Sequence, residues 1–160
     1  MSASMGARTL RQRGFTLMEL LVTATVLLVL ASATVPIMKN AVQRQKELEL
    51  RRDLREMRMA IDAFRADAQA QKIKAPPVEA NFCPESLEQL VEGIQATGSA
   101  SRKIKYLRRI PVDPFTGRPE WGMRSSSDDP TSTSWGGGHV FDVYSLAQGS
   151  SMNGTPYKEW

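Results

Sequence analysis

The stretch Arg11-Gln-Arg-Gly-Phe-Thr-Leu-Met-Glu-Leu-Leu21 decides how this chain is organised. It ends a basic N-terminal tail at Gly14 and opens an apolar run at Phe15, which one acid, Glu19, interrupts. Residues 15–38 number about 24, and an α-helix of that length measures roughly 36 Å. Such a helix crosses a hydrocarbon core of about 30 Å with some tilt. The sequence therefore predicts a transmembrane helix over residues 15–38.

The net charge of +4 lies almost entirely before the apolar run. Residues 1–14 contain three arginines and no acid, which leaves 18 of the 21 basic residues against 17 acids in the remainder. Arginines on one side of a membrane span predict a cytoplasmic N-terminus and a C-terminal part on the other side. The near-neutral remainder argues against nucleic-acid binding by the whole protein.

Three interpretations of the N-terminal region compete. Ala31-Ser-Ala33 fits the small-residue cleavage pattern of an ordinary secretory signal. A plain signal anchor is the second interpretation, and a leader cut before the apolar run is the third. An acid within a membrane span costs up to about 2.5–3.5 kcal/mol at the centre. A signal peptide gains nothing from Glu19, whereas an assembling helix gains if the acid meets a positive group on a neighbour.

Residues Arg13-Gly-Phe-Thr-Leu-Met-Glu-Leu-Leu-Val22 resemble the class III leader of type IV pilins and type II secretion pseudopilins. The resemblance implies that prepilin peptidase cleaves between Gly14 and Phe15 and then methylates the new amine of Phe15. It also implies that Glu19 is an assembly residue, which pairs with that amine in an adjacent subunit. A glycine suits the cleavage point because it has no side chain to keep a protease from the backbone.

The same resemblance implies an α+β type IV pilin fold, in which a long N-terminal helix packs on a small antiparallel sheet. Residues 1–14 would then be the leader and 15–38 the transmembrane or filament-core part of the helix. Residues 39–75 would continue the helix, and residues 76–160 would form a globular head. Pro36 lies inside the helical pattern, where we expect it to kink the helix.

An apolar stripe predicts how the helix meets the head. Its members recur in steps of four and three, which places them on one helical face: Leu50, Leu54, Met57, Ile61, Phe64 and Ala68. The stripe is short for a coiled-coil seam, so we expect it to pack against the head. Pro76-Pro77 is expected to end the helix near Lys74.

The rest of the head is expected to hold one short helix and about three strands in one sheet. The helix would begin near Pro84 and stop at Gly93. Strands are expected over residues 120–124 and 139–145, separated by a polar loop. Cys83 is expected to be a buried thiol, and the basic cluster of residues 102–109 a solvated connector.

No residue set in the sequence predicts an enzyme. Ser134, His139 and Asp142 have no spacing that supports a catalytic triad, which is recognised by geometry. One cysteine and one histidine do not suit a zinc site. No cofactor is expected on these grounds.

Calcium is the one ion that the resemblance raises, because major pseudopilins bind it in the loop after the last strand. That loop, residues 146–160, contains no aspartate here, although a hard cation prefers several oxygens including carboxylates. Asp128 and Asp129 of the neighbouring loop, with Ser145, are the remaining candidates for such a site.

The resemblance therefore predicts a subunit of a type II secretion pseudopilus, rooted in the bacterial inner membrane with its head in the periplasm. Expected partners are further copies of the chain, prepilin peptidase, other pseudopilins and the inner-membrane assembly platform. Two alternatives stay open. The first is a type IV pilus or competence pilin that adheres or binds DNA through residues 102–109. The second is a periplasmic domain with an ordinary signal peptide, whose mature chain would begin at Thr34.

Overall fold

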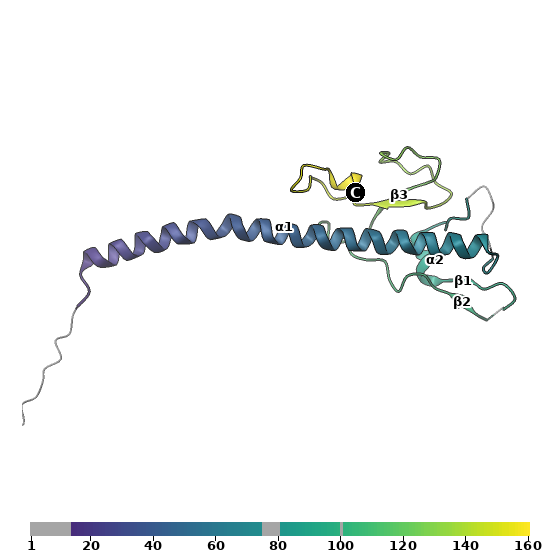
Figure 1. Ribbon diagram of the computed structural model, residues 1–160, viewed down its shortest axis with the longest axis horizontal. Coiled ribbons are helices and arrows are strands. Elements are labelled where there is room, and N and C mark those ends of the chain that lie inside the picture. The colour runs from purple at the N-terminus through teal and green to yellow at the C-terminus, as the bar shows by residue number, and fades with distance from the viewer. Residues whose placement is uncertain (1–13, 75–80, 100) are drawn as a thin grey trace, which may run out of the picture. The chain divides into compact units, whose positions relative to one another are not determined.

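The computed structural model describes residues 14–74, 81–99 and 101–160, with the backbone alone for residues 33–37. The helices and strands are α1 (Leu17–Gln69), α2 (Leu87–Glu92), β1 (Ile94–Gln95), β2 (Lys103–Ile104), β3 (Gly122–Arg124), β4 (Asp142–Tyr144) and the 3-10 helix η2 (Tyr157–Glu159) (Figure 1). The chain divides into two compact units between Ala41 and Val42. Leader residues 1–13 lie outside the described residues. The kink at Pro36, whose side chain is not described, stays a prediction.

Apolar side chains cover the start of α1 in the first unit. Those between Phe15 and Leu30 are 52–81% exposed, so one copy of the chain leaves them uncovered. Hydroxyl groups in this stretch donate back to the preceding turn, as from Thr25 to the Leu21 carbonyl at 3.0 Å. Such bonds satisfy a polar group without water. Within the described residues, no helix is both long and apolar enough to cross a membrane. The span expected over residues 15–38 stays a prediction.

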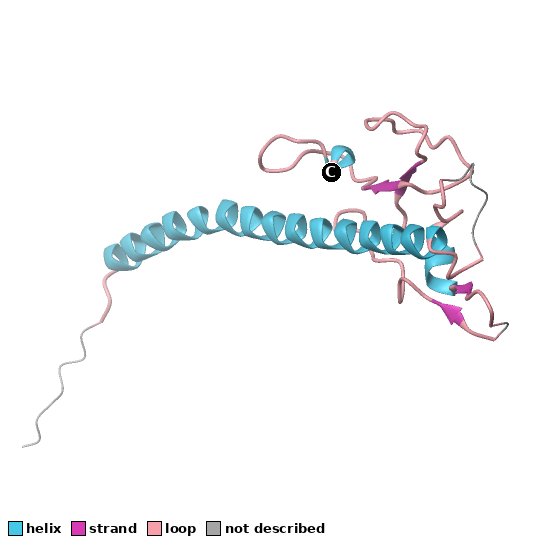
Figure 2. Ribbon diagram, turned by 45° about the vertical axis from the view of Figure 1, so that its right-hand side comes forward, coloured by secondary structure: helices cyan, strands magenta, loops and turns pink. Residues whose placement is uncertain are grey.

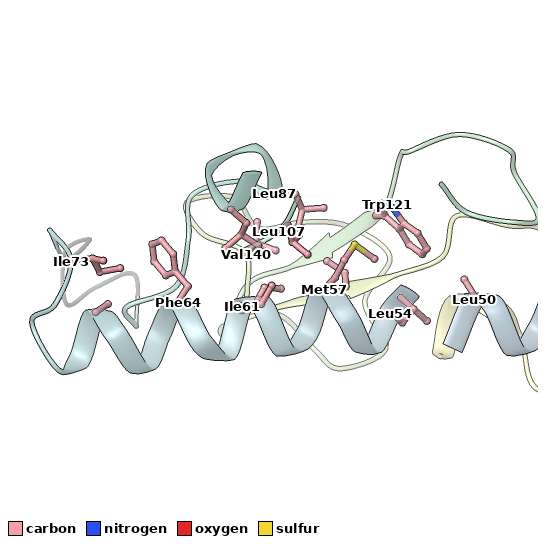
Figure 3. Packing of buried hydrophobic residues seen from close by; sticks show 14 of the residues in the cluster. Leu50, Leu54, Met57, Ile61, Phe64, Ile73, Leu87, Leu107, Trp121 and Val140 are labelled. Atoms are coloured by element: carbon pink, nitrogen blue, oxygen red, sulfur yellow. The ribbon is translucent and has the colours of Figure 1, made fainter. Parts of the chain in front are cut away.

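The second unit is built on the predicted apolar stripe of α1. All six members of the stripe are buried, with at most 2% of each exposed. They form one core with residues of the head that include Leu107, Trp121 and Val140 (Figure 3). Burying a Leu, Ile or Phe side chain fully is worth about 1.5–3 kcal/mol. The expectation that the stripe packs against the head is therefore confirmed.

The predicted end of α1 is wrong. The helix stops at Gln69 rather than near Lys74, well before Pro76-Pro77, which lies outside the described residues. The prolines therefore do not set the last helical residue. A local hydrogen-bonding pattern ends the helix instead.

That pattern is a Schellman motif. Gln71 adopts a left-handed conformation, with φ of 55°, and its N–H donates to the Ala68 carbonyl at 3.0 Å. The Lys72 N–H donates to the Asp67 carbonyl at 2.9 Å, which completes the motif. The Lys72 ammonium also contacts the Asp67 carboxylate at 3.1 Å. The chain then turns so that Ile73 is buried, 1% exposed, in the core.

Among the described residues, the strands form two sheets of two strands, not one sheet of three. Strand β1 pairs antiparallel with β2, aligning Ile94 with Ile104. Strand β3 pairs antiparallel with β4, aligning Gly122 with Tyr144. Figures 1 and 2 show the two sheets on different sides of the second half of α1. The β3 and β4 strands confirm the predicted positions, but β1 and β2 are too short to show alternation in the sequence.

Helix α2 begins later than expected and ends where expected. Its N-cap is Ser86 in an extended conformation, so Pro84 precedes the helix. Gly93 ends it with φ of 80°, a conformation that glycine adopts without strain. A Cβ at Gly93 would lie 2.8 Å from the Ile104 carbonyl oxygen of β2, so the glycine also permits this close approach.

Candidate processing and assembly site

Gly14 and Phe15 lie outside the helix, in a chain without regular secondary structure. Both are exposed, and a Cβ built at Gly14 would meet no atom within 4 Å. The peptide bond between them is therefore accessible and not locked into helical hydrogen bonds. A protease requires such access to the backbone on both sides of the bond that it cleaves.

Thr16 caps the start of α1. Its side-chain hydroxyl accepts a hydrogen bond from the Glu19 N–H at 3.2 Å, and its carbonyl accepts one from the Leu20 N–H at 3.1 Å. Thr16 and Glu19 also form the Thr-x-x-Glu pattern of a capping box. Sequence reasoning missed this role of Thr16, although the pattern was there to read. The cap fixes the helix start just after the predicted cleavage point.

Glu19 presents its carboxylate on the surface of the first helical turn. A negative charge there gains about 0.3–1 kcal/mol from the positive end of the helix dipole. Among the described residues, none forms an ion pair with Glu19. Its carboxylate is exposed and can meet a positive group on another molecule.

Ser134, His139 and Asp142 do not form a triad, because each has other partners. His139 Nε2 lies 2.8 Å from the Ser126 hydroxyl and accepts the Ser126 N–H at 3.1 Å. The Asp142 carboxylate binds Arg58 at 2.7 Å. Ser134 hydrogen-bonds within its own loop. The structure gives each of the three a role in holding loops and strands together.

Each calcium candidate makes hydrogen bonds within the protein. Asp128 accepts two backbone N–H groups of its own loop, at 2.7 and 3.0 Å, and these bonds lower its pKa. Asp129 accepts the Thr131 hydroxyl at 2.7 Å, and Ser145 donates its hydroxyl to the buried carboxylate of Asp113. In the described part of the chain, no group of three His, Cys, Asp or Glu residues could hold a metal. These residues do not fit a calcium site.

Cys83 and the basic cluster lie as expected. Cys83 is fully buried, and burial raises the pKa of its thiol. In the cluster of residues 102–109, Leu107 is buried and the arginines and lysines are exposed. Tyr106 anchors the cluster by donating its hydroxyl to Asp67 at 3.1 Å and by an edge contact with Phe64.

Comparisons with known proteins found a family model and several relatives that match this sequence. Residues 9–35 match the family described as the prokaryotic N-terminal methylation motif. Type II secretion system core protein G of Pseudomonas aeruginosa is 27% identical, over 94% of this chain and 96% of that relative. The proteins of the same name from Pectobacterium carotovorum and Klebsiella pneumoniae are each 32% identical, over 70% and 66% of this chain and 67% and 70% of the relatives. No solved structure gives a significant match.

The methylation motif, the long first helix and the small antiparallel sheets define a pilin-like protein with a prepilin-type leader. Within that class, the chain belongs to the type II secretion system core protein G family, the major pseudopilins. These relatives favour type II secretion over the pilus and competence alternative. The first residue of the mature protein distinguishes an ordinary signal peptide from a prepilin leader.

Proposed function

We propose that this chain is a structural subunit of a type II secretion pseudopilus and that it acts without catalysis of its own. The observation that carries the proposal is the capped start of α1, where an exposed Gly14–Phe15 bond precedes an exposed Glu19. The likeness to type II secretion core proteins supports the system in which it works. Repeated extension of the filament would drive protein export.

Maturation is the first step of the proposal. Prepilin peptidase cuts between Gly14 and Phe15 and methylates the new amine of Phe15. N-terminal sequencing and intact-mass measurement of the mature protein test this step, with N-methylated Phe15 as the expected first residue. A mature chain that begins at Thr34 would instead identify an ordinary signal peptide and end the pseudopilin proposal.

Assembly is the second step. The cut creates a cation on Phe15, close to the exposed carboxylate of Glu19 in a neighbouring copy. Opposite charges attract far more strongly in a packed apolar filament core than in water, although desolvation opposes the pairing. Pairing between copies would set their axial register and cover the apolar side chains of residues 15–30.

Replacing Glu19 tests the pairing. Glu19→Ala is expected to leave the chain in the membrane but unassembled, because the charge that positions the neighbour is gone. Glu19→Gln is the sharper variant, since it removes the charge and keeps nearly the same size and helix preference. Filaments are measured by shearing and sedimentation, and membrane insertion by fractionation.

Glu49→Gln serves as the matched control, because Glu49 is an exposed acid further along α1. It is expected to assemble normally. Wild-type amounts of filament from Glu19→Gln would contradict the proposed pairing while leaving the maturation step intact.

The membrane anchor and the partners complete the proposal. Residues 15–38 would hold the unassembled subunit in the inner membrane in a single pass, with the arginine tail cytoplasmic and the head periplasmic. The exposed apolar side chains of the first unit support this anchor. The expected partners are further copies of the chain, prepilin peptidase, other pseudopilins and the assembly platform. Protease protection in spheroplasts tests this topology, because an added protease should reach the head and spare the tail.

A further inference from the structure

Residues 146–160 are tied to the head by charged side chains from distant parts of the chain. The segment has no strand or α-helix of its own, and its only regular element among the described residues is η2. The segment makes some backbone hydrogen bonds of its own, such as that from the Ser151 N–H to the Thr155 carbonyl at 2.8 Å, and its other backbone groups need partners elsewhere. Those partners come from α1 and from β3.

Arg58 of α1 is the first tie. Its guanidinium donates to the Asp142 carboxylate at 2.7 and 3.4 Å, to the Val143 carbonyl at 3.1 Å and to the main-chain oxygen of Trp160 at 2.8 Å. One cation thus gathers a carboxylate and two main-chain oxygens, one of them from the segment. The side chains of Arg58 and Asp142 are 39% and 29% exposed, so solvent screens the pair only in part.

Arg124 of β3 is the second tie, and its side chain is only 5% exposed. It donates to the Ser132 carbonyl at 2.7 Å and to the Lys158 carbonyl at 2.9 Å. A third nitrogen lies 3.6 Å from Asp142, so the two arginines share this carboxylate. The guanidinium also lies over the Tyr144 ring at 4.1 Å.

The oxygens that these arginines collect are the kind that a calcium ion collects, namely a carboxylate and several backbone carbonyls. Two fixed positive charges already stand at Asp142, and a divalent cation placed there would be repelled by both. A third charged residue also contacts the segment. Glu47 of α1 accepts the Met152 N–H at 2.9 Å and the Tyr157 hydroxyl at 3.1 Å.

We propose that Arg58 and Arg124 take the place of a divalent cation in this head. They neutralise Asp142 and hold main-chain oxygens of residues 146–160, so that the segment folds without bound calcium. The inference concerns the head alone and does not depend on the proposed role in secretion.

Hydrogen exchange of the full-length chain in detergent, read by mass spectrometry on peptides from residues 146–160, tests the proposal. In the unmodified chain, exchange of these peptides is expected to be the same with excess calcium and with excess chelator. Faster exchange under chelation, or slower exchange on adding calcium, would overturn the proposal without any substitution.

The second arm uses Arg58→Met, which keeps the length of the side chain and removes its charge and donors. Exchange in residues 146–160 is expected to accelerate roughly tenfold to a hundredfold, because hydrogen bonds to a charged group are lost. Arg58→Lys keeps the charge and should restore part of the protection. Unchanged exchange in Arg58→Met would also overturn the proposal.

Arg118→Met is the matched control for lost charge. Arg118 pairs with Glu120 at 3.9 Å, and both side chains are more than half exposed, at 72% and 66%. Exposed pairs contribute little. Protection of residues 146–160 should therefore be unchanged in this variant.

Discussion

Some residues of this chain contact near neighbours in the sequence, and others contact residues far away in it. Glu19 and Thr16 interact within one helical turn, so their interaction can be predicted from their spacing in the sequence. Arg58 and Asp142 are 84 residues apart, and Glu47 and Tyr157 are 110 apart. Nothing local marks these four as partners. In the sequence, Glu47 is one of several acids in a helical segment, but in the structure it accepts hydrogen bonds from residues 146–160.

Gly122 carries a prediction at the residue scale. It is aligned with Tyr144 across β3 and β4, and a Cβ there would lie 2.2 Å from Cζ of the Tyr144 ring. That ring has little room to move, since its hydroxyl donates to the Thr133 carbonyl at 2.9 Å and Arg124 lies over its face. Gly122→Ala is therefore expected to lower the free energy of unfolding by about 1–3 kcal/mol, as overpacking does. Urea denaturation measures this change.

A double-mutant cycle gives the control for Gly122→Ala. In a Tyr144→Ala background the ring is gone, so the same change should cost much less. An equal cost in both backgrounds would show that the ring contact is not the cause.

The elements show where sequence patterns succeed. The stripe of α1 was readable because helical periodicity links its members and burial then follows. The end of α1 was not readable, because the Schellman motif is closed here by Gln71, a residue without the usual preference for a left-handed conformation. Strands β1 and β2 could not be predicted either, since two residues are too few to show an alternation of apolar and polar side chains.

Two glycine substitutions near this helix end should change the free energy of unfolding in opposite directions. Gln71→Gly relieves a left-handed residue, and we expect the free energy of unfolding to rise by up to about 1 kcal/mol. Gln69→Gly places glycine in the last helical residue and should lower it by up to about 1 kcal/mol. Thermal and urea denaturation of both variants measure the difference. A loss of stability in Gln71→Gly equal to that in Gln69→Gly would contradict the assigned helix end.

At the scale of the whole molecule, the stability of the head depends on ionised carboxylates. The Lys72 ammonium, followed by the Tyr106 hydroxyl, lowers the pKa of Asp67. Backbone donors lower the pKa of Asp128, and the Thr131 hydroxyl lowers that of Asp129. A depressed folded-state pKa contributes stability above the unfolded-state value, which is lost as the pH falls through the folded-state value.

The head should therefore lose stability as the pH falls below 3.8, the ordinary aspartate pKa. Urea midpoints measured from neutral to acidic pH test this expectation. Asp67→Asn is expected to be less stable than the wild type at neutral pH and to converge with it in acid, since the variant has no charge to lose there. A constant difference between the two proteins at every pH would show that the Asp67 charge is not involved.

The sequence by itself predicted the leader and determined the helical stripe and the family resemblance, because each rests on residues within a few turns of one another. Tertiary structure alone decided where α1 ends, how the short strands pair and how residues 146–160 are held. Those outcomes depend on side chains that meet only after the chain folds back on itself. The arginines at 58 and 124 illustrate this division most clearly, since only the fold brings them to the same carboxylate.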